Sequence, residues 1–173
     1  MQPTFNILAL DPAMCTGFAH TNGQYGVWEL GRGGAEHHGN RLIRFRDYLL
    51  EAAGKWGCDK IAFEDASFGS RNPAVQALHN ELRGTIKLVA AELNVPFVGY
   101  KPSSIKKFAT NYGFAKKDQM IRAAETMLGI RTQSSDVADA CFILAMAQQE
   151  WQAEERRKAR PAPPKVKERR LFR

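Results

Sequence analysis

The stretch Phe5-Asn-Ile-Leu-Ala-Leu-Asp-Pro-Ala-Met-Cys-Thr-Gly17 decides the fold, because its apolar run ends on one carboxylate. Ile7 to Leu10 are all apolar, which predicts a short strand covered on both faces, and the Asp-Pro pair that follows interrupts it. Asp11 is therefore expected where a buried strand meets a turn. That position is also typical of an aspartate that only shapes the turn. A second apolar run, 60–63, ends on Glu64 in the same way.

Length and composition indicate one domain followed by a basic tail. The chain has 173 residues, 44% of them hydrophobic and 25% charged, which is ordinary for a domain with its own core. Of the net charge of +7, residues 154–173 carry +6, from nine Lys and Arg against three Glu, and three prolines there prevent one continuous helix. We therefore expect a domain over residues 1–153 and, over 154–173, a basic arm suited to phosphates. A solvated tail without function is the alternative.

Several classes of protein are disfavoured by the same observations. No apolar run approaches the roughly 18 residues of a transmembrane helix, and no secretory signal is recognisable, so no membrane partner is expected. Cys15, Cys58 and Cys141 lack the ligand spacing of a zinc site and do not suggest a disulfide framework. Reduced thiols and a cytoplasmic location are the simplest interpretation, and no histidine is assigned a catalytic role.

The pattern along the chain predicts an α/β fold. Asn22-Gly23 separates two strand-like runs, which is a strong hairpin signal, so the first three strands should be antiparallel. Helical periodicity over 40–57, followed by the run at 61–63, is typical of an α/β crossover to a parallel strand. The expected fold is a five-stranded mixed sheet, three antiparallel strands and then two parallel ones, flanked by helices. The remaining expected elements are a helix from Asn72-Pro73, a strand within 94–100, and helices from Pro102, Lys116 and Ser134 or Ser135.

The last helix should place two acids on its inward face. Asp136 and Asp139 continue an apolar stripe at i, i+3, i+4 spacing, so both should point toward the sheet. One acid at a helix start often only complements the helix dipole, but several crowded carboxylates repel each other and lose hydration. If the first and fourth strands are neighbours, Asp11 and Glu64 lie beside these acids. Oxygen ligands without His or Cys favour Mg²⁺ or Mn²⁺ over zinc, and two such ions suit phosphate chemistry.

These motifs resemble the RuvC family of Holliday junction resolvases. The resemblance covers about residues 5–150 in the family's order, through 7–17, 61–64, 105–107 with 115–117, and 136–140. It implies an RNase H-like fold, a homodimer, and paired nicks in four-way DNA junctions inside a bacterial cell or phage-infected host. It also implies that water attacks the phosphodiester directly, with two Mg²⁺ ions for which Mn²⁺ substitutes, and leaves 5′-phosphate ends.

The resemblance also implies residue roles. The expected metal-binding and catalytic acids are Asp11, Glu64, Asp136 and Asp139, and the lysines expected at the scissile phosphate are Lys106 and Lys117. Further expected DNA contacts are Lys107, Lys116, Arg71 and Arg83, with a solvated basic face as the alternative for the lysines.

The chain departs from the family pattern at two positions near these motifs. Ala13 stands where the family usually has glycine, so the turn after Asp11 is expected to differ. Phe68 lies one residue later than the family's aromatic. It is expected either to stack on junction bases or to anchor its own loop.

Three other interpretations stay open. A flap or branched-DNA nuclease would use the same acids on a broader set of substrates. A noncatalytic DNA-binding protein would leave DNA strands intact whether or not metal is present. A sugar-kinase or actin-type ATP-binding fold also has a first strand that ends in Asp before a Thr-Gly turn, but it needs two domains and a second phosphate loop that this chain does not show.

Overall fold

A computed structural model describes residues 5–31, 38–65 and 72–159 of the chain. Within them the strands and helices follow one another in the predicted order. The elements are β1 (Ile7–Asp11), β2 (Cys15–His20), β3 (Tyr25–Glu29), α1 (His38–Trp56), β4 (Lys60–Glu64), α2 (Pro73–Glu92), β5 (Phe97–Tyr100), α3 (Pro102–Thr110), α4 (Lys117–Leu128) and α5 (Ser135–Lys158). In the described part of the chain, no helix combines the length and apolar character that a membrane span requires.

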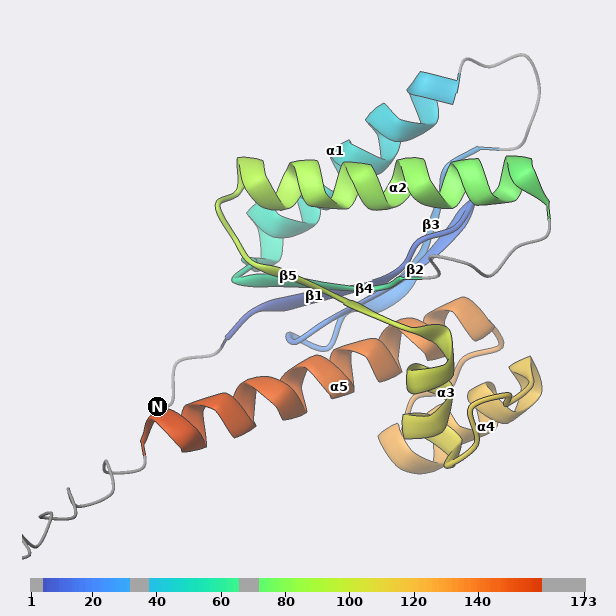
Figure 1. Ribbon diagram of the computed structural model, residues 1–173, viewed down its shortest axis with the longest axis vertical. Helices are drawn as coiled ribbons and strands as arrows, with labels where there is room; N and C mark the ends of the chain where they lie inside the picture. Colours follow the sequence, from blue (N-terminus) through green and yellow to red (C-terminus); the bar gives the residue numbers. More distant parts are fainter. Residues whose placement is uncertain (1–4, 32–37, 66–71, 160–173) are drawn as a thin grey trace, which may run out of the picture.

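One five-stranded sheet forms the middle layer, with the strand order β3-β2-β1-β4-β5. β1, β2 and β3 pair antiparallel, whereas β4 pairs parallel with both β1 and β5. Helices α1 and α2 cover one face, and α5 with α3 and α4 covers the other (Figure 1). The predicted mixed sheet, three antiparallel strands followed by two parallel ones, is confirmed.

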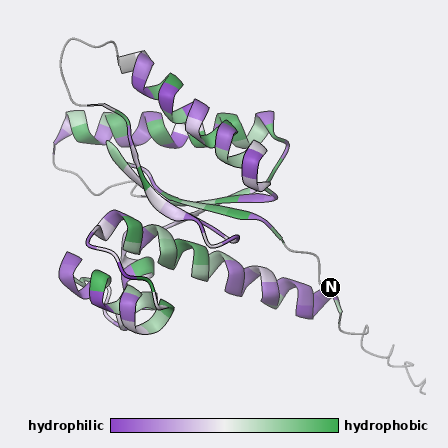
Figure 2. Cartoon of the chain, turned by 180° about the vertical axis from the view of Figure 1, so that it is seen from behind, coloured by the Kyte–Doolittle hydropathy of each residue, from purple (hydrophilic) through white to green (hydrophobic). Residues whose placement is uncertain are grey.

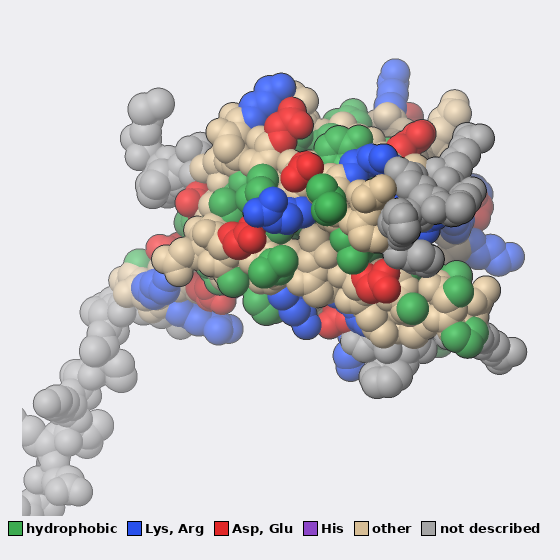
Figure 3. Space-filling model, turned by 90° about the horizontal axis from the view of Figure 1, so that it is seen from above, with side chains coloured by type: hydrophobic (Ala, Val, Ile, Leu, Met, Phe, Trp, Pro, Cys, Tyr) green, Lys and Arg blue, Asp and Glu red, His purple; other side chains and the backbone are tan. Residues whose placement is uncertain are grey.

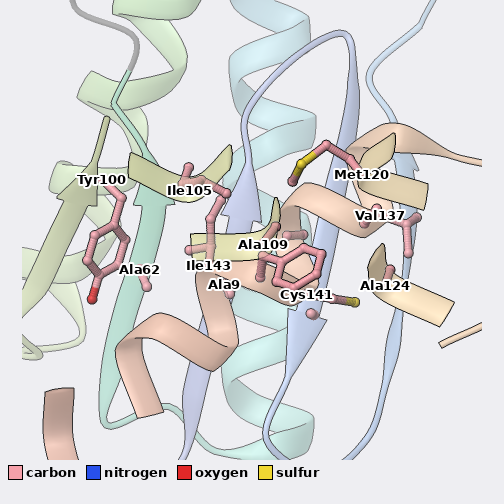
Figure 4. Packing of buried hydrophobic residues seen from close by; sticks show 14 of the residues in the cluster. Ala9, Ala62, Tyr100, Ile105, Ala109, Met120, Ala124, Val137, Cys141 and Ile143 are labelled. Carbon is pink, nitrogen blue, oxygen red and sulfur yellow. The ribbon is translucent and has the colours of Figure 1, made fainter. Parts of the chain in front are cut away.

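Residues 7–10 of strand β1 are all apolar because they contribute side chains to two cores. Ile7 and Ala9 belong to the core beneath α3, α4 and α5, and Leu8 and Leu10 belong to the core beneath α1 and α2. Figure 4 shows the first of these cores, where β1 and β4 meet α5 through small side chains. Each fully buried Leu or Ile contributes about 1.5–3 kcal/mol to stability. The central strand is therefore held firmly at the end where Asp11 emerges.

Local signals in the sequence define the ends of several elements. Gly23 has φ +91° in the tight β2–β3 hairpin, and Gly57 ends α1 with φ +81°, a conformation that glycine adopts without strain. Asn72 caps α2 by accepting a hydrogen bond from the N–H of Ala74 at 3.0 Å. Helix α5 continues to Lys158, and its last turns are hydrophilic where its first half is hydrophobic (Figure 2). Most of the predicted tail, 160–173, lies outside the described residues.

Helix α5 begins directly against strand β2 at Gly17. A Cβ atom at Gly17 would lie 2.0 Å from the carbonyl oxygen of Asp136 and 3.0 Å from the backbone nitrogen of Val137. No side chain fits in that space, because the obstructing atoms are backbone. Gly17 pairs with Asp11 across the β1–β2 ladder, so the first turn of α5 is held directly beside the end of β1.

We predict that Gly17→Ala lowers the free energy of unfolding by about 1–3 kcal/mol or more, the usual cost of forcing extra volume into a packed site. Chemical denaturation of the two proteins measures the difference. The matched control is Gly54→Ala on α1, where an added Cβ meets nothing within 4 Å and helix propensity improves. Equal stability of Gly17→Ala and wild type would show that α5 does not depend on this approach.

Candidate active site

The ends of two parallel strands bring the first two acids together. β1 and β4 pair in register from Ile7 opposite Lys60 to Leu10 opposite Phe63, so the next position on each strand is Asp11 and Glu64. Both residues are partly buried at the carboxyl ends of their strands. Strands one and four are thus neighbours, which was the condition for Asp11 and Glu64 to meet, and the two carboxylates share one edge of the sheet.

The turn after Asp11 is fixed by a buried threonine. The Thr16 hydroxyl donates to the carbonyl of Ala13 at 2.7 Å, and Thr16 is fully buried. Ala13 is not among the residues with positive φ, so this turn has no need of glycine there. Alanine in place of the family's glycine at position 13 therefore causes no backbone strain. The hydrogen bond from Thr16 orders the turn that follows Asp11.

The start of α5 supplies the other two acids. Ser134 caps the helix by accepting from the N–H of Val137 at 3.3 Å, and the Ser135 hydroxyl donates to Asp136 Oδ1 at 3.1 Å. Asp139 follows one turn later, and its Oδ1 is buried without a hydrogen-bond partner. A buried carboxylate oxygen without a hydrogen-bond partner lowers the stability of the fold unless a ligand binds it.

Mutual repulsion shows that the four acids form one electrostatic group. Burial raises the pKa of Asp11 well above its ordinary value, and the charges of Glu64, Asp139 and Asp136 raise it further. Burial followed by the charge of Asp139 raises the pKa of Glu64 to about 7. The pKa of Asp139 rises to about 6, mainly through burial. The chain thus holds charges together that destabilise one another.

Two of the predicted lysines offset this repulsion. The charge of Lys106 on α3 lowers the pKa values of both Glu64 and Asp139, and that of Lys117 at the start of α4 lowers those of Asp11 and Asp139. Lys107 and Lys116 are exposed neighbours whose charges are not among the causes of these shifts. Of the four lysines, Lys106 and Lys117 are therefore the two whose charges act on the acids.

The remaining predicted DNA contacts do not join this group. Phe68 and Arg71 lie outside the described residues, so their predicted roles stay predictions. Arg83 on α2 forms an ion pair with Asp65, the residue that follows Glu64, and its side chain is only 11% exposed. This ion pair fastens α2 to the end of β4, and the predicted contact of Arg83 with DNA stays a prediction.

The composition of the group fits a hard divalent cation. All four candidate ligands are carboxylates, one of their oxygens is buried and unpaired, and their repulsion would be relieved by positive charge. Among the described residues, no three acidic, histidine or cysteine side chains lie close enough to coordinate one ion as they stand. The backbone thus brings the four acids near one another. To coordinate one cation, their side chains would have to change conformation.

The sequence analysis assigned no role to two residues that build this site. Gly17 provides the space for α5, and Thr16 fixes the turn after Asp11. Both belong to the Thr-Gly pair that follows Asp11 in the sequence, and this pair is the local signal from which their roles could have been suspected. Gly17 meets a segment more than 100 residues away, and the Thr16 hydrogen bond closes a turn with Ala13. Hydrophobic periodicity shows neither contact.

The strand order, the two helical layers and the acids at the ends of adjacent central strands define an RNase H-like protein with a carboxylate site. Two solved structures share the fold. The Thermus thermophilus RuvC structure superposes with a TM-score of 0.69 at 21% identity, over 86% of this chain and 97% of that one. The yeast mitochondrial Holliday junction resolvase Ydc2 gives a TM-score of 0.59 at 18% identity, over 90% and 82%.

The chain belongs to the RuvC family, because the family model described as crossover junction endodeoxyribonuclease RuvC matches residues 26–148. That match contains Glu64, Asp136 and Asp139, while Asp11 precedes it. A relative from Anaeromyxobacter sp. (strain Fw109-5), named crossover junction endodeoxyribonuclease RuvC, is 35% identical over 60% of this chain. The matched stretch spans 50% of that relative. A relative of the same name from Caldicellulosiruptor saccharolyticus is 27% identical over 86% of this chain and 98% of its own length.

We predict that Asp139→Asn stabilises the metal-free protein at pH 8 by about 1–3 kcal/mol, since each pKa unit corresponds to about 1.36 kcal/mol and the group is partly solvated. The pKa of Asp139 is raised from 3.8 to about 6, so its charge opposes folding above pH 6 and is absent below pH 4. The gain should therefore fade as the pH is lowered from 8 to 4.

Thermal unfolding in EDTA measures this gain, at about 2–4 °C per kcal/mol. The control is Glu51→Gln, which removes an exposed acid on α1 and should not stabilise the protein. If Asp139→Asn is no more stable than wild type at pH 8, burial and neighbouring charge do not raise the pKa of Asp139 in the folded protein.

Proposed function

We propose that this protein is a metal-dependent, structure-selective endodeoxyribonuclease that resolves four-way DNA junctions by paired phosphodiester hydrolysis. The observation that carries the proposal is the group of Asp11, Glu64, Asp136 and Asp139, whose repulsion is partly offset by the charges of Lys106 and Lys117. Relatives with full-length similarity are named crossover junction endodeoxyribonucleases, and a structural neighbour from T. thermophilus is RuvC in complex with a Holliday junction substrate, at a TM-score of 0.70 and 20% identity.

The four acids are the proposed ligands for two Mg²⁺ ions, with Mn²⁺ as a substitute. When bound, such ions activate a water and stabilise the charge that develops on the phosphate and the leaving oxygen. The acids hold the cations at the carboxyl ends of β1 and β4. Lys106 and Lys117 compensate the negative charge that an incoming phosphate adds to a site that is already acidic.

The reaction needs no covalent intermediate with the protein. The oxygen of water forms the new bond to phosphorus, and the bond from phosphorus to the 3′ oxygen breaks. The products are a 5′-phosphate and a 3′-hydroxyl. The residues of the chain orient the phosphate and hold the charge, and none of them has to act as the nucleophile.

Paired nicks on two strands require two active sites, so the proposed active form is a homodimer. The face formed by α1 and α2 carries acidic and basic side chains interspersed with apolar ones (Figure 3). Ile43 on α1 and Leu88 on α2 are 58% and 54% exposed, which supports this face as the contact between subunits. A DNA substrate of this kind places the protein in the cytoplasm of a bacterial cell or infected host.

We predict that Asp11→Asn lowers the rate of nicking of a labelled mobile four-way junction by about 100-fold or more, a loss typical when one transition-state-stabilising group is removed. Junction binding in Ca²⁺ should persist, because the fold and the lysines remain. The same assay with flap and linear DNA, and with Mg²⁺, Mn²⁺ or EDTA, defines the substrate and the metal. Unchanged nicking by the variant would refute the assignment, and intact strands with every metal would identify a noncatalytic DNA-binding protein.

We further predict that the basic tail contributes to DNA binding through phosphates. Removal of 160–173 takes away six basic residues and one acidic residue, so the plot of log binding constant against log salt should become shallower by about 0.9 for each phosphate that the chain no longer neutralises. The matched control replaces Pro161, Pro163 and Pro164 with alanine and keeps every charge. Identical slopes for the truncated and intact chains would exclude the tail from DNA binding.

A further inference from the structure

Two aromatic side chains project from the connection between α3 and α4. Tyr112 is 58% exposed and Phe114 is 79% exposed, the highest value among the large hydrophobic side chains of the described residues. Their rings lie 5.8 Å apart at 60° to each other, a favourable edge-to-face arrangement. Neither ring contributes to a core, although together they present a large apolar surface to solvent. An exposed apolar surface of this kind is typical of a site that binds a ligand or another macromolecule.

Hydrogen bonds fix this connection in one conformation. The Thr110 hydroxyl accepts from the N–H of Tyr112 at 3.2 Å and lies 2.9 Å from the carbonyl of Lys106, to which it can donate. Asn111 adopts a left-handed conformation with φ 60°, and its N–H donates to the carbonyl of Lys107 at 2.8 Å. Thr110 thus links the backbone of Lys106, a lysine of the candidate site, to the backbone of Tyr112. The backbone at Tyr112 therefore has a defined position relative to Lys106, and Phe114 follows two residues later.

The charge around the pair is strongly positive. Residues 101–118 contain five lysines and one acid, Asp118, which already forms an ion pair with Arg122. Lys106 and Lys117, at either side of the pair in sequence, are the two lysines whose charges act on the carboxylates. The α1/α2 face differs, since acids and bases are mixed there (Figure 3). Aromatic rings set among lysines are the usual surface for nucleic acid, where bases stack on the rings and phosphates meet the cations.

We propose that Tyr112 and Phe114 form a stacking contact for the nucleotides next to the phosphate that enters the acidic site. This proposal rests on the proposed nuclease function and extends it to a contact that selects unstacked DNA. Nucleotides at a branch point are partly unstacked, so their base faces are available to exposed rings, whereas those of continuous duplex are not. The pair therefore favours branched over linear DNA, and it does so independently of Phe68.

The test compares the double variant Tyr112→Ala/Phe114→Ala with wild type on a four-way junction and on linear duplex. In Ca²⁺, the double variant should bind the junction at least about fivefold more weakly, the lower end of what removal of a stacking ring causes, with little change on duplex. 2-Aminopurine placed beside the nick site should lose the fluorescence change that wild type produces on binding. The double variant Tyr112→Phe/Phe114→Tyr keeps both rings and should retain both signals.

Met127→Ala is the matched control, because Met127 is equally exposed at 59% on α4 but lies away from the lysine pair in sequence. The inference is overturned if the alanine double variant binds the junction as wild type does. It is also overturned if the substitution changes only the oligomeric state, which would identify the rings as a contact between protein chains. Because binding is measured in Ca²⁺, a wild-type protein that binds through the rings but never nicks DNA would refute the nuclease proposal and leave the stacking contact standing.

Discussion

The close approach of α5 to strand β2 at Gly17 is the constraint on which the candidate site depends. Strands β1 and β4 bring Asp11 and Glu64 together by pairing alone, because their carboxyl ends coincide. Asp136 and Asp139 join them only because the backbone of α5 begins where any side chain on Gly17 would stand. A glycine without any special backbone angle thus determines whether two acids or four share the site.

The site is assembled at a cost to stability. Buried carboxylates with raised pKa values oppose folding at neutral pH, and two lysines offset only part of that repulsion. The cost is tolerable because the surrounding core is extensive: residues 7–10 of β1 are fully buried, and α5 packs along the sheet through small residues such as Ala140 and Ala147. Clusters of carboxylates with raised pKa values are characteristic of functional sites, where a bound ligand can neutralise their charge.

The mixed sheet and the inward face of α5 could be predicted from the sequence, because both follow from short-range patterns. The meeting of Asp11 and Glu64 depended on the first and fourth strands being neighbours, which only the fold shows. The apolar run before Asp11, the Asn22-Gly23 turn and the helical spacing of Asp136 and Asp139 each report local structure. The role of Gly17 could not be predicted, since it concerns the space between segments more than 100 residues apart. Arg83 illustrates the same limit, because its ion pair with Asp65 is known only from the fold.

The central claim is that the four acids hold divalent cations at the ends of β1 and β4. Anomalous scattering from crystals grown with Mn²⁺ tests it most directly, because the signal locates the metal without reference to activity. The account predicts anomalous peaks bounded by the carboxylates of Asp11, Glu64, Asp136 and Asp139, which disappear in crystals of Asp11→Asn. Mn²⁺ bound elsewhere, or four acids that remain apart at saturating metal, would contradict it.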